Sequence, residues 1–210
     1  MLENFKGAIF DLDGVIVDTA KYHYLAWERL AKELGFEFTL KDNERLKGVS
    51  RMRSLEILLE IGGISLGEAE KAALAEKKNG WYVDYIRRMD ESELLKGARD
   101  YILKLRSRGV KIALGSASKN SPMILENLKI TELFDAVIDG NKVSKAKPDP
   151  EVFLLGAREL GLDPADCVVF EDAEAGVEAA KRAGMKVVGI GERQILKEAD
   201  SVVAGLFELL

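Results

Sequence analysis

The sequence predicts an α/β fold: a doubly wound parallel sheet with an inserted helical domain. Two observations support this prediction. From about residue 98 onward, short apolar runs alternate with segments of helical periodicity, which is typical of a parallel sheet whose strands are joined by helices. From about residue 16 to residue 89 the patterns are helical throughout, although an apolar run typical of a buried strand precedes them. A helical module therefore interrupts the sheet after its first strand.

Local signals delimit the first strand and the helical insert. Ala8-Ile9-Phe10 is an apolar run that ends at the polar Asp11-Leu12-Asp13-Gly14. The spacing of apolar residues predicts three helices, over residues 20–34, 52–61 and 68–89. Gly35 provides a stop for the first helix. The third is expected to begin at Ser65-Leu66-Gly67-Glu68, which has the form of a capping box.

The rest of the chain alternates between helix and strand. Gly109 marks the end of one helix, while Ser121-Pro122 and Asp149-Pro150 mark the starts of two others, with Ser or Asp as N-cap and Pro at the first helical position. The predicted strands cover residues 110–114, 136–138, 167–170 and 186–190. The predicted helices cover residues 98–108, about 121 onward, 150–160 and 173–183. Because helices separate the strands, we expect the strands to run parallel.

Composition narrows the class of protein. Of the 210 residues, 47% are hydrophobic and 32% charged, and the net charge is -5. This negative balance argues against a nucleic-acid partner, since duplex binding normally needs a basic face. No segment approaches the roughly 20 apolar residues that span a bilayer. The single cysteine, Cys167, lies in an apolar run and excludes a disulfide framework. We expect a cytoplasmic protein with no membrane partner.

Reactive side chains follow several of the predicted strands. In open parallel sheets, ligands bind beyond the carboxyl ends of the strands, so the residues that come next are informative. They include four carboxylates, a hydroxyl and a lysine: Asp11, Asp13, Ser116, Lys147, Glu171 and Asp172. Gathered at one edge of the sheet, the carboxylates would repel one another unless a cation lay among them. Oxygen ligands of this kind favour Mg²⁺.

This set of residues favours metal-assisted phosphoryl transfer. Asp11 can attack phosphorus and form an aspartyl phosphate. Asp13, two residues on, can give a proton to the leaving oxygen and later accept one. Ser116, the neighbouring backbone amides and Lys147 can hold the phosphoryl oxygens, and Mg²⁺ together with Lys147 would neutralise their charge.

Each of these residues also has a simpler interpretation. Asp-x-Asp after a strand is common turn chemistry, and Gly14 permits a positive φ. Glu171-Asp172 could cap a helix, and Lys147 alone could be a solvated surface residue. Their joint occurrence at successive strand ends favours a catalytic role over these structural ones. A calcium loop does not fit, because Gly14 stands fourth in the segment from Asp11, whereas the EF-hand glycine stands sixth.

The order of these residues resembles the haloacid dehalogenase superfamily of phosphotransferases over the whole chain. The matching motifs are Phe10-Asp11-Leu12-Asp13-Gly14-Val15, Ser116, Lys147 and Glu171-Asp172. The resemblance implies a Rossmann-like phosphoryl-transfer core formed by residues 1–15 and 92–210. It also implies that residues 16–91 are a cap domain that determines substrate specificity.

Within that superfamily, the closer resemblance is to the β-phosphoglucomutase family. The matching segments are Asp18-Thr19-Ala20, Tyr22-His23, Ala26-Trp27, Leu46 to Arg51 with Ser54, Lys77-Lys78-Asn79 and Ser116 to Asn120. This resemblance implies catalytic residues at Asp11, Asp13, Thr19 and Lys147. It implies substrate-binding residues at His23, Trp27, Leu46, Lys47, Gly48, Val49, Ser50, Arg51, Ser54, Lys78, Ser116, Ala117, Ser118, Lys119 and Asn120.

The same resemblance implies how the metal is held. Mg²⁺ would be bound by Asp11, by the backbone carbonyl of Asp13 and by Asp172, with Glu171 as a supporting carboxylate. It also implies a cis peptide bond between Lys147 and Pro148.

The expected activity is therefore the interconversion of β-D-glucose 1-phosphate and glucose 6-phosphate, through an aspartyl phosphate and a 1,6-bisphosphate. Arg51 suits this reaction because its planar fork could hold a second phosphate. A sugar-phosphate phosphatase of the same superfamily is the alternative. A catalytically silent binding domain is a third, which the intact Asp11, Asp13 and Lys147 disfavour. We expect a monomer whose partner is a small sugar phosphate.

Overall fold

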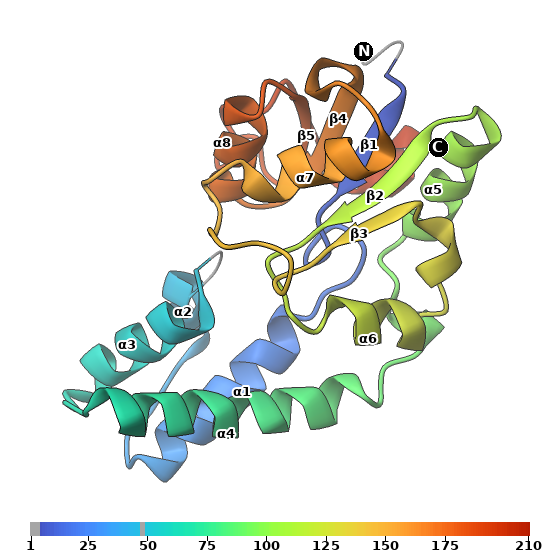
Figure 1. Cartoon of the computed structure of the whole chain (residues 1–210). Helices are drawn as coiled ribbons and strands as arrows, with labels where there is room; N and C mark the ends of the chain where they lie inside the picture. Colours follow the sequence, from blue (N-terminus) through green and yellow to red (C-terminus); the bar gives the residue numbers. More distant parts are fainter. Residues whose placement is uncertain (1–4, 47–48) are drawn as a thin grey trace. The chain divides into compact units, whose positions relative to one another are not determined.

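The computed structural model describes residues 5–46 and 49–210, and the chain forms two compact units (Figure 1). Unit 1 comprises the chain up to Asp18 together with Met89–Leu210, and unit 2 is Thr19–Arg88. The expected boundaries lay after residues 15 and 91. In the structure, Val17 forms bridges with Asp13 and Leu94, which attaches residues 16–18 to unit 1.

Unit 1 contains a parallel six-stranded sheet with the strand order β3-β2-β1-β4-β5-β6. Its strands are β1 (Gly7–Phe10), β2 (Lys111–Gly115), β3 (Ala136–Ile138), β4 (Cys167–Glu171), β5 (Lys186–Ile190) and β6 (Ser201–Val203). The predicted α/β fold with a parallel sheet is confirmed. Strand β6 was not predicted, because its three residues are only half-buried and carry no periodic signal.

Register aligns the reactive strand ends. Phe10, the last residue of the central strand β1, pairs with Leu114 of β2 and with Phe170 of β4. Asp11 is therefore the first residue after β1, and it lies level with Glu171, the last residue of β4. All of the strands end in the same direction, so the segments that follow them meet at one edge of the sheet.

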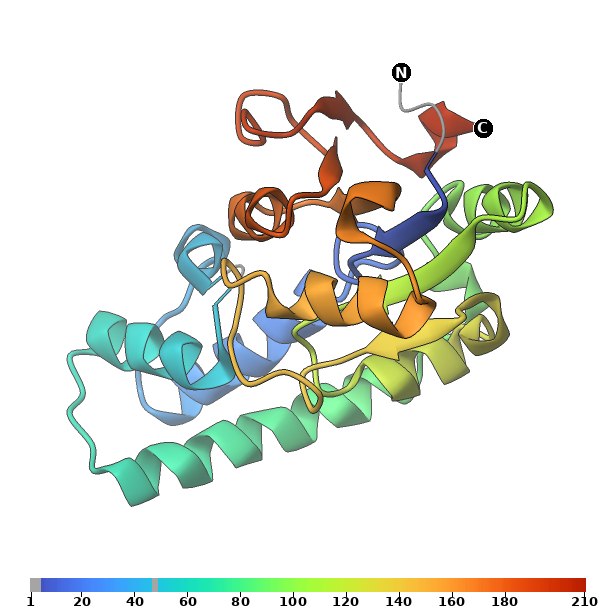
Figure 2. The ribbon, with the colours of Figure 1, turned by 45° about the horizontal axis from the view of Figure 1, so that its top comes forward.

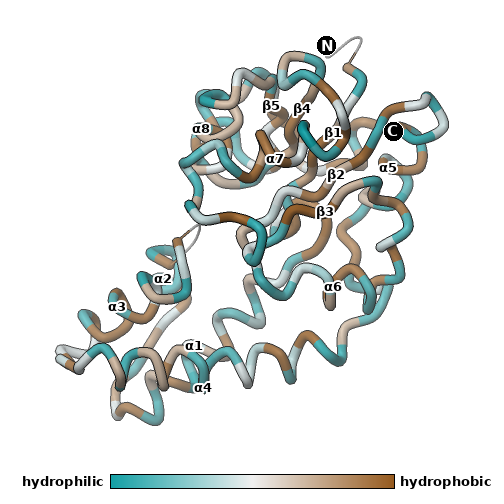
Figure 3. The backbone as a smooth tube through the Cα atoms, in the orientation of Figure 1, coloured by the Kyte–Doolittle hydropathy of each residue, from teal (hydrophilic) through white to brown (hydrophobic). Residues whose placement is uncertain are grey.

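Helices cover both faces of this sheet (Figure 1, Figure 2). They are α5 (Ala98–Ser107), α6 (Ser121–Asn127), α7 (Glu151–Leu160) and α8 (Glu174–Arg182). Ile9 and Val169 belong to a core formed with side chains of α7 and α8. On the opposite face, the ring of Tyr101 from α5 meets Phe10 and Phe170 edge-on. This division follows from the alternation of side chains along a strand. Because both faces are covered, the strands consist largely of apolar residues, as the colouring of the tube shows (Figure 3).

Unit 2 is helical, with its own core. Its helices are α1 (Ala20–Glu33), α2 (Leu40–Asn43), α3 (Arg51–Gly62) and α4 (Glu68–Ile86). Trp27 and Leu30 of α1 pack with Leu55 and Leu58 of α3 and with Ala75 of α4. The predicted apolar stripes thus face one another. Helix α2 was not predicted, because four residues are too few to show a helical period.

Three predicted N-caps were wrong by one or two residues, although α4 begins at Glu68 as predicted. Helix α4 is capped by Gly67, whose N–H donates to the Glu70 carboxylate at 3.0 Å, and not by Ser65. Helix α6 has Asn120 as its N-cap, and Ser121 is its first residue. Helix α7 has Pro150 as its N-cap instead of Asp149, and Glu151 is its first residue. Within residues 5–46 and 49–210, no helix combines the length and apolar character that a membrane span requires.

Candidate active site

In unit 1, Asp11 lies beside three other residues of the strand ends and their loops, namely Lys147, Glu171 and Asp172. Its backbone N–H continues the β1–β4 pairing by donating to the Phe170 carbonyl at 2.9 Å. The residue is 6% exposed, so the sheet holds its carboxylate in a largely desolvated position. Lys147 Nζ donates to Asp11 Oδ1 at 2.6 Å. This contact fixes the carboxylate and partly neutralises it.

Lys147 joins two carboxylates. Besides Asp11 it contacts Glu171, with Nζ 2.9 Å from Glu171 Oε2. Burial by itself would lower the pKa of the Lys147 ammonium, but the charges of Asp11 and Glu171 outweigh it and raise that pKa well above its usual value. Lys147 is therefore a permanent cation. The Lys147–Pro148 peptide bond is cis, as the sequence resemblance implied.

The acidic pair at the end of β4 carries surplus negative charge. Burial and the neighbouring Asp11 raise the pKa of Glu171 well above its usual value. The protein around the Asp172 carboxyl, and then the charges of Asp11 and Asp13, raise the pKa of Asp172 to about 7. One ammonium thus stands against several carboxylates, and both shifts have the sign expected where a further cation would be stabilising.

Three of these carboxylates could hold a metal ion together. Asp11, Glu171 and Asp172 each offer an oxygen, and these oxygens lie within 4.8 Å of one another. Hard oxygen donors with surplus negative charge fit Mg²⁺. The Asp13 side chain does not belong to this group of three, although its charge reaches Asp172.

Two glycines make room for the acidic pair. Gly14 has φ +74°, and a Cβ built there would lie 2.1 Å from Asp172 Oδ2. A Cβ at Gly176, in the first turn of α8, would lie 2.0 Å from Glu171 Cδ. Side chains at either position would displace a carboxylate, so the geometry of the site depends on their absence.

The loop after β2 is organised by its own hydroxyl groups. Ser116 is buried, its N–H donates to the Ile138 carbonyl at 2.9 Å, and its Oγ accepts from the Ser118 N–H at 3.1 Å. Ser118 Oγ in turn accepts from the Asn120 N–H at 3.3 Å. Ala117 and Lys119 are exposed. A buried hydroxyl therefore follows β2, and its role in binding phosphate stays a prediction.

Two of the predicted residues of unit 2, His23 and Trp27, lie around the buried Lys78. Lys78 of α4 is 2% exposed, and its Nζ lies 2.8 Å from His23 Nδ1 on α1. The same Nζ lies 4.3 Å from the ring centroid of Trp27 and 5.1 Å from that of Tyr82. Burial, and then the charge of Arg51, lower the pKa of Lys78 to about 7.

His23 is kept neutral by the same surroundings. Its pKa is lowered well below the usual value, first by burial and then by the charges of Lys78 and Arg51. Its ring stacks on Tyr82 with 4.0 Å between centroids. A neutral His23 can accept a hydrogen bond at Nδ1 from the Lys78 ammonium.

The remaining predicted residues of unit 2 lie at helix starts or in the core. Thr19 is buried at the N-cap of α1. Ser50 caps α3 by accepting from the Arg53 N–H at 3.3 Å, and Ser54 is buried one turn later. Leu46 is buried in the core of unit 2, Val49 is exposed, and Arg51 pairs with Glu76 on α4. Lys47 and Gly48 lie outside the described residues.

Three comparisons with known proteins bear on this geometry. Residues 5–184 match the family model of the haloacid dehalogenase-like hydrolases. The chain belongs to this family. A protein described as β-phosphoglucomutase from Bacillus subtilis is 46% identical over 94% of this chain and 88% of its own length.

A second relative of this haloacid dehalogenase-like protein has a different description. It is a phosphorylated carbohydrates phosphatase from Thermotoga maritima, 34% identical over 94% of this chain and 92% of its own length. Among solved structures, that of β-phosphoglucomutase from Clostridium difficile superposes with a TM-score of 0.92. The two sequences are 43% identical, and the match covers 98% of this chain and 93% of the Clostridium difficile chain.

The sequence alone did not identify three residues that contact the predicted site residues: Gly176, Gly140 and Glu76. Gly176 and Gly140 each leave space for a neighbour: a Cβ at Gly140 would lie 2.2 Å from the Ala117 carbonyl oxygen. A glycine shortly after Glu171, at the start of a helix, was the available signal for Gly176. Nothing in the sequence linked Glu76 to Arg51, because the two belong to different helices.

Proposed function

We propose that this protein interconverts β-D-glucose 1-phosphate and glucose 6-phosphate, as a β-phosphoglucomutase. The observation that carries the proposal is the buried Asp11 carboxylate, held by Lys147 beside the acidic pair Glu171-Asp172. It is supported by relatives with that description at 46% and 43% identity. We further propose that unit 1 is the phosphoryl-transfer core and unit 2 the cap that sets specificity, in a cytoplasmic monomer.

Asp11 would be the nucleophile. As an aspartyl phosphate it would give its phosphoryl group to the 6-hydroxyl of β-glucose 1-phosphate, while Asp13 takes the hydroxyl proton. The resulting 1,6-bisphosphate would turn around. Asp11 would then attack phosphorus of the 1-phosphate, and Asp13 would return the proton to the departing oxygen. The products are glucose 6-phosphate and the phosphorylated Asp11 that began the cycle.

A Mg²⁺ ion fits the donor set and is part of the proposal. Asp11 and Asp172 would hold it together with the backbone carbonyl of Asp13, and Glu171 would support the site. When bound, the ion supplies positive charge against the transferring phosphoryl oxygens.

Residues of the chain supply the rest of the phosphate site. The Lys147 ammonium keeps the Asp11 carboxylate oriented. It also places positive charge near the phosphoryl oxygens, where negative charge must be stabilised in the transition state. Ser116 and the amides up to Asn120 would bind phosphoryl oxygens by hydrogen bonds. In unit 2, Arg51 would bind the phosphate that is not transferred, and Lys78 with His23 would orient the sugar.

A sugar-phosphate phosphatase is the second candidate. The phosphorylated carbohydrates phosphatase from Thermotoga maritima, at 34% identity, favours it. The two activities share the attack by Asp11 and differ in what accepts the phosphoryl group from the aspartyl phosphate. A sugar hydroxyl gives a mutase, and water gives a phosphatase.

One product assay separates the candidates. The protein is incubated with β-glucose 1-phosphate, Mg²⁺ and a trace of the 1,6-bisphosphate, and glucose 6-phosphate and inorganic phosphate are measured in parallel. We expect glucose 6-phosphate in large excess, and no product from Asp11→Asn. Free phosphate with little glucose 6-phosphate would contradict the mutase activity and show that the protein is a phosphatase.

A further inference from the structure

Arg51, the proposed ligand of the second phosphate, is already paired with a carboxylate. It is the first residue of α3, and its Nη1 lies 2.7 Å from Glu76 Oε1 on α4. The Arg51 side chain is 28% exposed and that of Glu76 is 72% exposed. The partner is thus the more solvated of the two, and its carboxylate can leave without being buried elsewhere.

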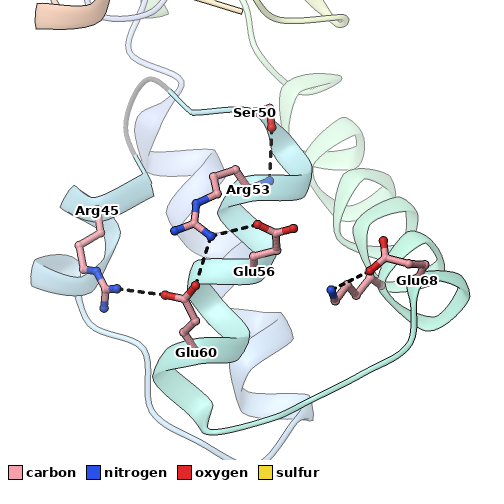
Figure 4. A network of polar contacts seen from close by, with 7 residues as sticks. Arg45, Ser50, Arg53, Glu56, Glu60 and Glu68 are labelled. Carbon is pink, nitrogen blue, oxygen red and sulfur yellow. Dashed lines mark hydrogen bonds and ion pairs between the residues drawn. The ribbon is translucent and has the colours of Figure 1, made fainter.

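This pairing differs from that of the neighbouring arginine. Arg53 bonds to Glu56 at 3.0 Å and Glu60 at 3.2 Å, both on its own helix (Figure 4). Arg45 also pairs with Glu60. These contacts tie α3 to itself and to the turn before it. Arg51, in contrast, reaches across to another helix of unit 2.

The surroundings of Arg51 are basic. Its charge is felt by Lys78 and by His23, whose pKa values it helps to lower. Lys78 is buried against aromatic rings, and His23 is its hydrogen-bond partner. A carboxylate on Arg51 offsets part of this positive charge as long as no anionic ligand is bound.

We propose that Glu76 determines the specificity of the distal phosphate site by acting as a displaceable counter-ion of Arg51. The proposal rests on the proposed function, in which Arg51 binds the phosphate that is not transferred. A phosphate dianion brings more charge and more acceptor oxygens than a carboxylate and can replace it on the fork. Monoanions and neutral sugars compete less well against Glu76.

The counter-ion has a consequence for turnover. An exposed ion pair is weak, so Glu76 does not block the site and only reduces the affinity of an arriving phosphate. A mutase has to release one end of its bisphosphate in every cycle in order to turn it around. A carboxylate that recaptures Arg51 favours that release.

The test measures binding without turnover. In an Asp11→Asn background with Mg²⁺ present, glucose 1,6-bisphosphate is titrated calorimetrically into the otherwise unchanged chain, Glu76→Gln, Arg51→Ala and the Arg51→Ala/Glu76→Gln pair. We expect Glu76→Gln to lower the Kd about threefold to fivefold, in keeping with an exposed ion pair. In the Arg51→Ala background the same substitution should have no effect.

Glu68→Gln is the matched control. Glu68, labelled in Figure 4, pairs with Lys71 at 2.9 Å. It lies on the same helix as Glu76, about two turns before it. The substitution Glu68→Gln removes the same charge as Glu76→Gln, and we expect it to leave the Kd unchanged. An unchanged Kd in Glu76→Gln, or an equal gain in Glu68→Gln or in the Arg51→Ala background, would overturn the inference alone. Failure of the Asp11→Asn parent to bind the bisphosphate would overturn the proposed function and the inference with it.

Discussion

Lys147 Nζ lies 2.6 Å from Asp11 Oδ1, although the two residues are 136 positions apart in the sequence. The same ammonium also holds Glu171. Both carboxyl groups are buried, so the lysine ammonium offsets negative charge at a place that little water can reach. The contact joins the proposed nucleophile to the loop before α7 and to the end of β4.

Removing this cation should be costly to both activity and stability. Lys147→Met leaves Asp11 and Glu171 buried without their ammonium, and we expect the free energy of unfolding to fall by roughly 3 to 5 kcal/mol. Phosphoryl transfer should fall at least about a hundredfold, since the charge on the phosphoryl group loses a partner. Urea unfolding and the product assay measure the two effects. Lys145→Met, at an exposed lysine of the same loop, should change neither. A stable, active Lys147→Met protein would contradict the role of the ion pair.

Metal affinity should depend on pH through Asp172. Its pKa is raised to about 7, so the carboxyl is protonated below that pH and a proton must leave when Mg²⁺ binds. We expect the association constant to fall as pH decreases below about 7, by up to tenfold per unit, and to level off above it. Calorimetry in buffers of different ionisation enthalpy should also detect the released proton. A constant affinity from about pH 5.5 to 8 would show that Asp172 is not the titrating ligand.

Gly176 should tolerate no side chain. In Gly176→Ala the new Cβ would lie 2.0 Å from Glu171 Cδ, so the carboxylate has to move away from Lys147. We expect weaker Mg²⁺ binding and lower activity, even though alanine favours helix. Gly80→Ala is the matched control, because Gly80 lies inside α4 with nothing within 4 Å of its Cβ. That variant should gain about 0.5–1 kcal/mol of stability and keep its activity. Equal behaviour of the two variants would refute the steric argument.

Lys78 should make stability rise with pH. The pKa of Lys78 is lowered to about 7 in the folded chain, whereas an unfolded lysine has its ordinary pKa of 10.5. Between these values the unfolded state binds more protons, so the free energy of unfolding increases with pH, by up to about 1.4 kcal/mol per unit. Below about pH 7 both states are charged, and the contribution no longer changes.

The measurement is urea unfolding of the wild type and Lys78→Met between about pH 7 and 9. We expect the variant to lack the increase that Lys78 causes. Lys77→Met, at the exposed neighbour of Lys78 on α4, should retain it. Parallel pH profiles for wild type and Lys78→Met would mean that the buried lysine keeps an ordinary pKa.

Local patterns were sufficient for most of the fold. Apolar runs such as those at β1, β4 and β5 identified buried strands, and helical spacing located α1, α3 and α4. Such elements depend on neighbouring residues, which the sequence shows directly. N-caps were less well predicted, since Gly67, with Glu70 bonding back to it, caps α4 instead of Ser65. The choice between the two caps depends on which carboxylate reaches back, and the sequence places Glu68 three residues after Ser65 and Glu70 three residues after Gly67.

The sequence by itself determined the chemical inventory and its rough location: Asp11 after the first strand, Ser116 after the second, and Glu171-Asp172 after the fourth. The topology of a parallel sheet is enough to bring such residues to one edge. Only the tertiary structure decided which atoms meet there and in unit 2. The contacts of Lys147 with Asp11, of Lys78 with His23 and of Glu76 with Arg51 all join different elements. Their distances, and the pKa shifts that follow, depend on packing and burial, which no local pattern in the sequence specifies.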